Sequence, residues 1–186
     1  RFPIGAVWRA ARRGEIGMPG AGAQLHLPLT SPDDTPPSSP SHRGSSAPPS
    51  PAPVHWDEHR IVLTNAARTR VQATSAAAGR AGVRAGMRPA EARARCADLV
   101  ELSWDDAIIG AAITEASAQF LAASPQVTPV SGAPGLWWVG ASGFDAVGGE
   151  RQLAHALLRV ARRWHPRPRV AIADSCVAAR AATWAG

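Results

Sequence analysis

The decisive stretch of this sequence reads Gly82-Val83-Arg84-Ala85-Gly86-Met87 and continues, after Arg88, as Pro89-Ala90-Glu91-Ala92-Arg93-Ala94-Arg95-Cys96. The second part carries the signals of a helix. Proline is tolerated in a first helical turn, Glu91 suits the positive end of the helix dipole, and Arg93 and Arg95 suit the negative end. We therefore predict a short helix that follows the glycine-containing segment.

Two short β-rich runs precede this stretch. They are Arg60–Thr64 and Arg68–Ala73, with Asn65 between them, and this arrangement predicts a hairpin. Ser75 can then cap a small alanine-rich helix that ends at Gly82.

The second half of the chain predicts alternating helices and strands. Ser103-Trp104-Asp105-Asp106 resembles a capping box, and apolar residues follow at helical spacing until Pro125. The further predicted elements are strands at 127–130 and 135–139, a helix at 150–164 and a buried strand at 169–173. With a strand near Phe2, the order becomes βαββαβ, which predicts an α+β, ferredoxin-like fold.

The composition favours a partly folded protein with a polyanionic partner. The chain has 186 residues, 45% of them hydrophobic, and carries 20 Lys+Arg against 14 Asp+Glu, with a pI near 11.2. Such a basic balance fits nucleic acid, although an arginine-rich and alanine-rich chain also fits a GC-biased genome. Cys96 and Cys176 are far apart, so neither a disulfide framework nor a zinc site is predicted.

The region between Thr30 and Pro53 is predicted to be a disordered linker. Fifteen of its 24 residues are proline or serine, and such a segment buries too little apolar surface to offset its ordering entropy. No apolar run in the chain approaches the roughly 20 residues of a membrane helix. We therefore expect a soluble, cytoplasmic protein. Because the chain opens on Arg1 and stops inside a predicted helix, 178–186, we expect it to be part of a longer polypeptide.

From Val71 onwards the chain resembles the palm and fingers of Y-family DNA polymerases, the DinB/UmuC group, and is most similar to the ImuB-like branch. The resemblance covers more than half of the chain and rests on the order and spacing of several short segments. These are Gly82–Met87, Glu91–Arg93, Ser124–Pro129, Gly135–Trp137, Val147–Glu150 and Arg169–Asp174.

The resemblance divides the chain into four parts. Residues 1–13 correspond to the start of the palm, 14–54 to a flexible linker, 55–103 to a fingers-like unit and 104–186 to a palm-like unit. By the same resemblance, we expect no segment of this sequence to correspond to a thumb or a little finger.

The resemblance also implies a lost metal site. Active members of the family hold catalytic magnesium through a Ser-Ile-Asp-Glu segment, which aligns with Ser131-Gly132-Ala133-Pro134 here. The two carboxylate positions are therefore Ala133 and Pro134, and neither side chain can ligate Mg²⁺. No carboxylate occurs anywhere from Ala116 to Phe144. The first catalytic aspartate of the family would lie just before Arg1.

The nucleotide pocket of the family is altered at the same time. The tyrosine and arginine that contact the triphosphate fall on Ala76 and Gly79, and the chain contains no tyrosine. The lysine after the last palm strand falls on Cys176, and the aromatic pair that screens the sugar falls roughly on Pro3 and Ile4. We therefore expect no cofactor, no metal and no catalytic residue, with Mg²⁺ required only if the protein is an active polymerase.

One further motif lies at the edge of the linker. Gln24, Leu25, Leu27 and Leu29 fit the Gln-Leu-x-Leu-x-Leu pattern with which bacterial proteins bind the replicative sliding clamp. Three leucines inserted in an apolar cleft, at about 1.5 to 3 kcal/mol each, are enough for micromolar binding after ordering costs. A chance run of leucine and proline accounts for the pattern equally well.

Arginines near the predicted helix at 150–164 form a second, weaker candidate site. Arg162, Arg163 and Arg167 can face DNA phosphates as a basic strip, or they can simply solvate the end of a helix.

Together these patterns predict a non-catalytic Y-family homologue. By resemblance it acts in DNA repair and damage-induced mutagenic translesion synthesis, as an adaptor between DNA, the sliding clamp and an error-prone replicative-type polymerase. An ImuA/RecA-like protein is a further partner implied by the resemblance. Two alternatives stay open: an active translesion polymerase, and a simple basic DNA-binding module.

Overall fold

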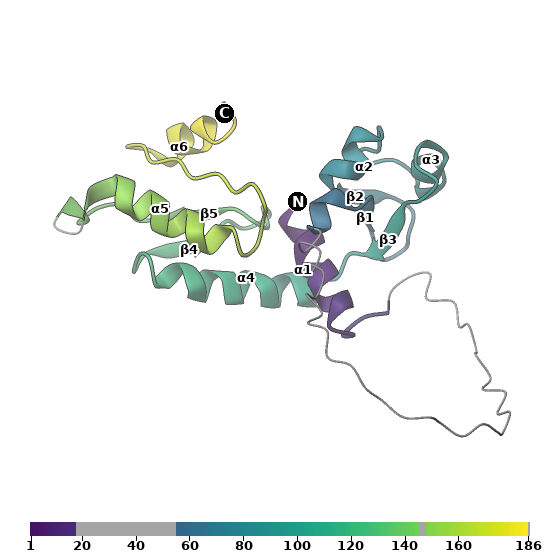
Figure 1. The fold of residues 1–186 in the computed structure, drawn as a ribbon, viewed down its shortest axis with the longest axis horizontal. Helices are drawn as coiled ribbons and strands as arrows, with labels where there is room; N and C mark the ends of the chain where they lie inside the picture. Colours follow the sequence, from purple (N-terminus) through teal and green to yellow (C-terminus); the bar gives the residue numbers. More distant parts are fainter. Residues whose placement is uncertain (18–54, 146–147, 186) are drawn as a thin grey trace, which may run out of the picture.

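Helix α1 (Phe2–Arg12) lies between two lobes of the molecule (Figure 1). The computed structural model describes residues 1–17, 55–145 and 148–185. We name residues 55–103 the sheet lobe and residues 104–185 the helical lobe. The expected linker at 30–53 and the motif Gln24–Leu29 lie outside the described residues.

The sheet lobe is built on three short strands, β1 (Ile61–Thr64), β2 (Val71–Thr74) and β3 (Val100–Ser103). Their order is β2-β1-β3, with β1 antiparallel to β2 and parallel to β3. The predicted hairpin is confirmed, and Asn65 organises its turn by accepting hydrogen bonds from the backbone N–H groups of Thr69 and Arg70. Strand β3 was not predicted, because its only signal is pairing with β1, which is distant in the sequence.

Two predicted helices of the sheet lobe are confirmed. They are α2 (Ala76–Arg80) and α3 (Pro89–Arg95), and a 3₁₀ turn, η1 (Trp56–Glu58), precedes β1. The Ser75 hydroxyl accepts from the backbone N–H of Ala78 at 3.1 Å, as expected for an N-cap. The apolar residues beneath these helices form one buried cluster, made of Val62, Val71, Ala78, Val83, Ala92 and Cys96.

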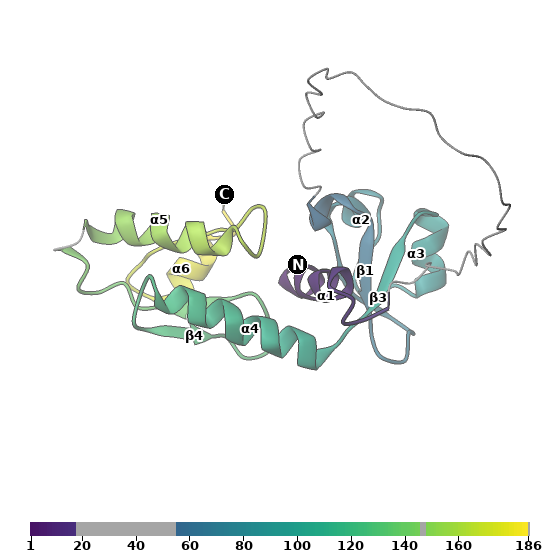
Figure 2. The same cartoon turned by 60° about the horizontal axis from the view of Figure 1, so that its bottom comes forward.

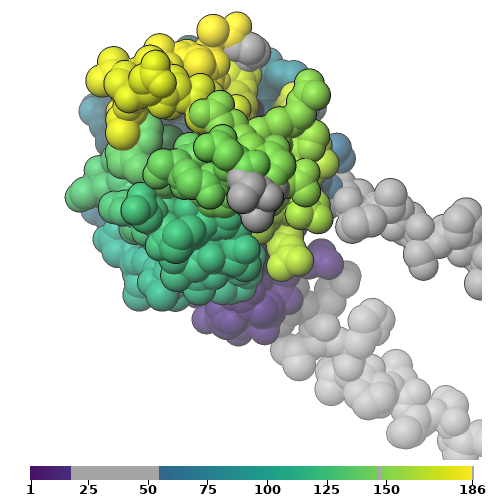
Figure 3. Space-filling model, turned by 90° about the vertical axis from the view of Figure 1, so that its left-hand side faces the viewer, coloured from purple at the N-terminus to yellow at the C-terminus, as the bar shows by residue number. Residues whose placement is uncertain are grey.

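The helical lobe consists of α4 (Asp106–Leu121), β4 (Val127–Pro129), β5 (Trp137–Val139), α5 (Gly149–Ala161) and α6 (Cys176–Ala182). The two strands predicted at 127–130 and 135–139 are confirmed as β4 and β5, and they pair antiparallel as a hairpin. Helix α4 is capped by Asp105, whose carboxylate accepts from the backbone N–H of Ile108 at 3.0 Å, rather than by the expected Ser103. Figure 3 shows α6 on the outer surface of this lobe.

Two predicted strands are not formed. Phe2 opens α1, because Pro3 suits a first helical turn and the apolar residues after it recur at helical spacing. The segment 169–173 joins no β-ladder in the described chain, although Val170 and Ile172 pack against the core of the helical lobe. The fold is therefore mixed α+β, as predicted, but the described residues form a three-stranded and a two-stranded sheet and not the expected four-stranded ferredoxin-like sheet.

Helix α1 contributes side chains to the hydrophobic cores of both lobes. Ile4 and Val7 belong to a buried cluster with Trp56, β1 and β3, whereas Phe2 and Ala6 belong to a second cluster with α4, α5 and Trp164. The two views in Figures 1 and 2 both place α1 against the start of α4 and beside the sheet lobe. Packing on opposite faces of one helix therefore fixes how the lobes meet.

The tight packing of α1 on Trp56 predicts the effect of a glycine substitution. A methyl group at Gly5 would lie 2.8 Å from the indole of Trp56, so Gly5→Ala should destabilise the protein by about 1–3 kcal/mol despite the higher helix propensity of alanine. A methyl group at Gly110, in α4, would have nothing within 4 Å, so Gly110→Ala should stabilise by up to about 1 kcal/mol. Urea unfolding of both variants checks this, and equal effects of the two substitutions would contradict the packing at Gly5.

Candidate functional site at the junction of the lobes

The tip of the β4–β5 hairpin carries the positions where the resemblance expects metal-binding acids. The backbone N–H of Ala133 donates to the carbonyl of Val130 at 3.2 Å, and the N–H of Leu136 donates to the carbonyl of Ala133 at 3.0 Å. Gly135 has φ +100° and sits so close to Phe2 that any side chain would collide with the Phe2 Cβ. The hairpin tip is therefore a tight turn packed on the first residue of α1.

Ala133 and Pro134 are half-buried in this turn, and neither offers an oxygen ligand from its side chain. Among the residues that the structure describes, no group of three or more His, Cys, Asp or Glu side chains is placed to hold a metal ion. Chemistry that needs two magnesium ions has no side-chain ligands at this turn.

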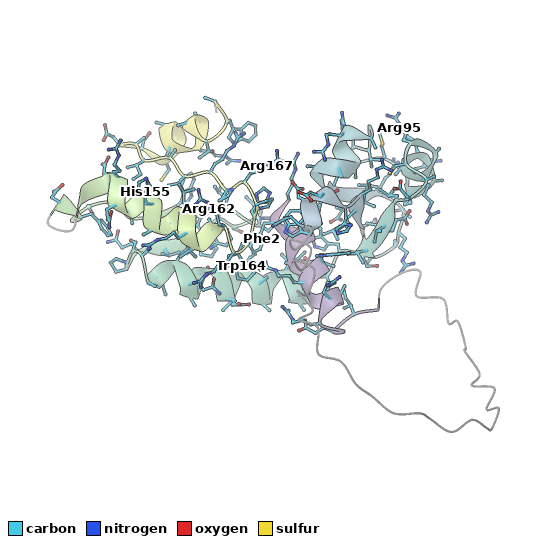
Figure 4. The ribbon with its side chains drawn as sticks, in the orientation of Figure 1. Phe2, Arg95, His155, Arg162, Trp164 and Arg167 are labelled. Carbon is cyan, nitrogen blue, oxygen red and sulfur yellow. The ribbon has the colours of Figure 1, made fainter. Side chains whose placement is uncertain are left out.

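The charged centre of the junction is Asp57, which is only 2% exposed. Its carboxylate accepts from the backbone N–H of Ala76 at 2.7 Å, from Arg167 at 3.4 Å, and lies 3.8 Å from the guanidinium of Arg1. These partners come from α2, from the loop after α5 and from the residue before α1. One buried carboxylate therefore connects both lobes and α1, and Figure 4 shows Arg167 at the side of the helical lobe that faces the sheet lobe.

A cavity of about 380 Å³ adjoins this carboxylate, lined by His55, Asp57, Glu58, Arg80, Pro166 and Arg167. Two imidazoles flank the indole of Trp56 beside it, His55 with ring centroids 5.2 Å apart and His165 with centroids 5.4 Å apart. Burial lowers the pKa of both histidines below the ordinary value, mainly by desolvation of the charged form. Both rings are therefore neutral at physiological pH, and the fixed charges around the cavity come from its arginines and carboxylates.

The positions expected to contact triphosphate are not assembled into one pocket. Ala76 is buried at the start of α2, where its N–H is already bound to Asp57, and Gly79 lies in the same helix. Cys176 begins α6 in the helical lobe and is exposed. Figures 1 and 2 both show α2 and α6 well separated. The described part of the chain places no cationic side chain at any of these three positions.

The predicted arginine strip is only partly free to contact DNA. Arg162 and Arg163 are exposed beyond the end of α5, whereas Arg167 is engaged by Asp57. The sheet lobe carries a larger set of exposed arginines, which were not predicted as a site: Arg68, Arg70, Arg80, Arg84, Arg88, Arg93 and Arg95. Their signal in the sequence is the high density of arginine between residues 68 and 95. The fold then places these arginines together on one small lobe.

The sequence of this chain matches the model of the impB/mucB/samB family over residues 56–184. A mixed α+β fold with this match defines the UmuC-type domain of Y-family DNA polymerases, and the chain belongs to that family. Membership implies binding to DNA and a role connected with DNA damage. No curated protein matches the chain significantly. In the described residues, no helix is long and apolar enough to cross a membrane.

The contacts of Asp57 predict a measurable coupling between the lobes. Asp57→Asn keeps an oxygen for the Ala76 N–H but removes the charge facing Arg167 and Arg1, so it should lower the free energy of unfolding by roughly 1–3 kcal/mol. Asp98 pairs with Arg60 on the surface, so Asp98→Asn is the matched control and should change stability little. Urea unfolding of the two variants, together with Arg167→Gln and the Asp57→Asn/Arg167→Gln double variant, measures the coupling. Strict additivity of the two changes would contradict a bridge between the lobes.

Proposed function

We propose that this protein is a non-catalytic, ImuB-like member of its family. It serves as an adaptor that brings DNA, the sliding clamp and an error-prone replicative-type polymerase together during damage-induced translesion synthesis. The observation that carries the proposal is the hairpin tip, where Ala133 and Pro134 occupy the two positions that the resemblance assigns to metal-binding carboxylates. An ImuA/RecA-like protein and association with the nucleoid are part of the same proposal and rest on the resemblance.

The chemistry of DNA synthesis explains why these positions decide between enzyme and adaptor. The attacking 3′ oxygen and the departing pyrophosphate both develop negative charge, and two metal ions held by carboxylates stabilise it. A methyl group and a pyrrolidine ring supply no ligand, and the segment from Ala116 to Phe144 contains no replacement acid. The substitutions at the nucleotide contacts, Ala76, Gly79 and Cys176, support the same conclusion, because none of them supplies a positive charge to a triphosphate.

A protein that lacks the metal site can still bind DNA without synthesising it. The exposed arginines of the sheet lobe and the overall charge of +6 suit phosphate contacts that depend on counterion release. An adaptor needs DNA affinity and docking sites for proteins, and it needs no metal centre.

Clamp binding through Gln24, Leu25, Leu27 and Leu29 is the least supported part of the proposal. It rests on the Gln-Leu-x-Leu-x-Leu pattern, which lies outside the residues that the structure describes. An extended peptide of this kind binds by inserting leucines into an apolar cleft while glutamine supplies a directed hydrogen bond. The pattern is therefore proposed as a docking peptide.

Primer extension tests the catalytic half of the proposal. With Mg²⁺, dNTPs and a primed template, the purified protein should incorporate no nucleotide above a preparation from empty-vector cells, because the carboxylates are missing. Incorporation that is lost in Glu58→Gln, which changes an exposed acid lining the junction cavity, would establish an active polymerase instead. DNA binding measured at several salt concentrations in the same preparation shows that the protein is folded and competent.

The clamp peptide predicts a binding defect of its own. Gln24→Ala combined with Leu27→Ala should weaken binding to immobilised clamp at least tenfold, because both the directed hydrogen bond and one buried leucine are lost. Surface plasmon resonance gives the affinity, and substitution of His26 by alanine, at a position that the pattern leaves free, is the matched control. Unchanged affinity in the double variant would show that the motif does not bind the clamp. If the clamp binds neither the unmodified protein nor the variant, the alternative of a simple DNA-binding module is favoured.

A further inference from the structure

The sheet lobe concentrates positive charge along one edge. Between residues 68 and 95 the chain has seven arginines and a single acid, Glu91, and all seven arginines are exposed. Strand β2 is the edge strand of the three-stranded sheet, and the loop that follows α2 is bound to its first residue. The N–H of Gly86 donates to the carbonyl of Val71 at 2.7 Å, and the N–H of Val71 donates to the carbonyl of Met87 at 2.9 Å. These two bonds bring the arginines of the β1–β2 turn and of the loop to the same edge.

The seven arginines differ in how their charge is compensated. Arg93 is paired with Glu101 at 2.7 Å, and Arg95 is paired with Glu91 at 3.1 Å. Arg80 lines the junction cavity. The remaining four form no ion pair with any other described residue, and we name them the arginine edge: Arg68, Arg70, Arg84 and Arg88.

Two members of the arginine edge are held in place by backbone carbonyls. The guanidinium of Arg70 donates to the carbonyl of Gly86 at 3.0 Å, and that of Arg84 donates to the carbonyl of Gly79 at 2.6 Å. A neutral carbonyl orients a guanidinium but does not compensate its charge. The other N–H groups of each planar guanidinium can therefore still donate to an anion.

Arg68 occupies a position that its backbone does not favour. It is the one non-glycine residue of the described chain with a positive φ, 52°, and Asn65 fixes the turn around it by accepting from the N–H groups of Thr69 and Arg70. Glycine adopts this left-handed conformation at no steric cost, whereas arginine is strained in it. The requirement of the turn does not explain an arginine here, so the side chain itself is the feature that needs a role.

The residues between these arginines favour a phosphate backbone as the occupant. The exposed ones are small: Ala66, Ala67, Thr69, Ala85 and Gly86. A side chain at Gly86 would have nothing within 4 Å, so the loop is open to close approach. Protein partners and lipid surfaces are bound by large apolar or aromatic anchors, and such anchors are missing from this set of exposed residues.

The sequence of the sheet lobe also favours duplex over single-stranded DNA. From Asp57 to Ser103 it contains no phenylalanine, tryptophan or tyrosine, and its one histidine, His59, is packed on Trp8 with ring centroids 5.1 Å apart. Proteins that bind single strands stack the bases on aromatic side chains. A surface that offers arginine without aromatic rings suits the duplex, whose phosphates are denser, about one charge per 1.7 Å of axis.

We propose that the arginine edge binds the phosphate backbone of double-stranded DNA without regard to base sequence. This inference rests on the DNA-binding part of the proposed function, and it names the form of the DNA and the residues that contact it. Duplex DNA then lies on the sheet lobe and not at the end of α5. Figure 4 labels Arg95 on the sheet lobe and Arg162 on the helical lobe, which lie on either side of α1.

The test measures binding of the full chain to three fluorescent probes at several salt concentrations. The first is a duplex of about 20 base pairs and mixed sequence, roughly two turns of B-DNA. The second is an unstructured single strand with the same number of phosphates. The third is a polyglutamate peptide, which carries negative charge without phosphate. Fluorescence anisotropy gives the affinity for each probe.

Two double variants remove the same formal charge from different places. Arg68→Gly combined with Arg88→Gln removes two members of the arginine edge, and glycine relieves the left-handed backbone, so the midpoint of urea unfolding should not fall. Arg151→Gln combined with Arg159→Gln alters exposed arginines of α5 and is the matched control. If Arg68→Gly disturbs the turn, Arg88→Gln alone decides the outcome.

We expect the edge variant to bind the duplex at least tenfold more weakly than the unmodified protein at about 0.1 M salt. The slope of log affinity against log salt concentration should fall by about 2, because each lost phosphate contact contributes about 0.9. The control variant should retain both values, and the unmodified protein should prefer the duplex to the other two probes. Equal losses in the two variants would assign the effect to net charge and overturn the proposal. A single strand or polyglutamate bound as tightly as the duplex would also overturn it.

Primer extension by the same preparations separates this inference from the proposed function. If the unmodified protein incorporates no nucleotide and the edge variant binds the duplex normally, the adaptor proposal stands and the inference fails. If the unmodified protein extends primers and the edge variant loses duplex binding, the adaptor proposal fails and the inference stands.

Discussion

The structure depends on one shared helix. Helix α1 places Ile4 and Val7 in the core of the sheet lobe and Phe2 and Ala6 in the core of the helical lobe. Each lobe has too few strands and helices to bury a large core alone, so apolar area on two faces of α1 supplies packing to both. The absence of a side chain at Gly5 is part of this arrangement, because it lets the indole of Trp56 lie directly on the helix.

At the junction around α1, apolar packing positions the elements, and the buried polar groups form contacts that stabilise the fold. The hairpin tip packs against α1 and carries Ala133 and Pro134, whose side chains offer no oxygen ligand, and the buried Asp57 uses its oxygens to hold the lobes together. Catalytic ligands are few and can be replaced without disturbing a core, whereas the apolar residues that position them also determine whether the chain folds. The arginines of the sheet lobe, by contrast, are exposed on the surface, where they are available to contact phosphates.

Local signals in the sequence determined the short elements by themselves. Ser75 capped α2, Pro89 opened α3, and the short apolar run at 135–139 indicated a strand, because caps, proline and short apolar runs act within one element. The identities at Ala133 and Pro134 were equally readable, and with them the lack of carboxylates at the hairpin tip.

Only the tertiary structure decided how distant residues meet. Strand β3 exists through pairing with β1, while the apolar run at 169–173 has the composition of a strand but no ladder partner among the described residues. The encounter of Asp57 with Arg167, 110 residues later, and of Arg9 with Trp164 has no local signature. Such contacts depend on the way two lobes pack on one helix, and the free energy of that packing is spread over many side chains that no short motif encodes.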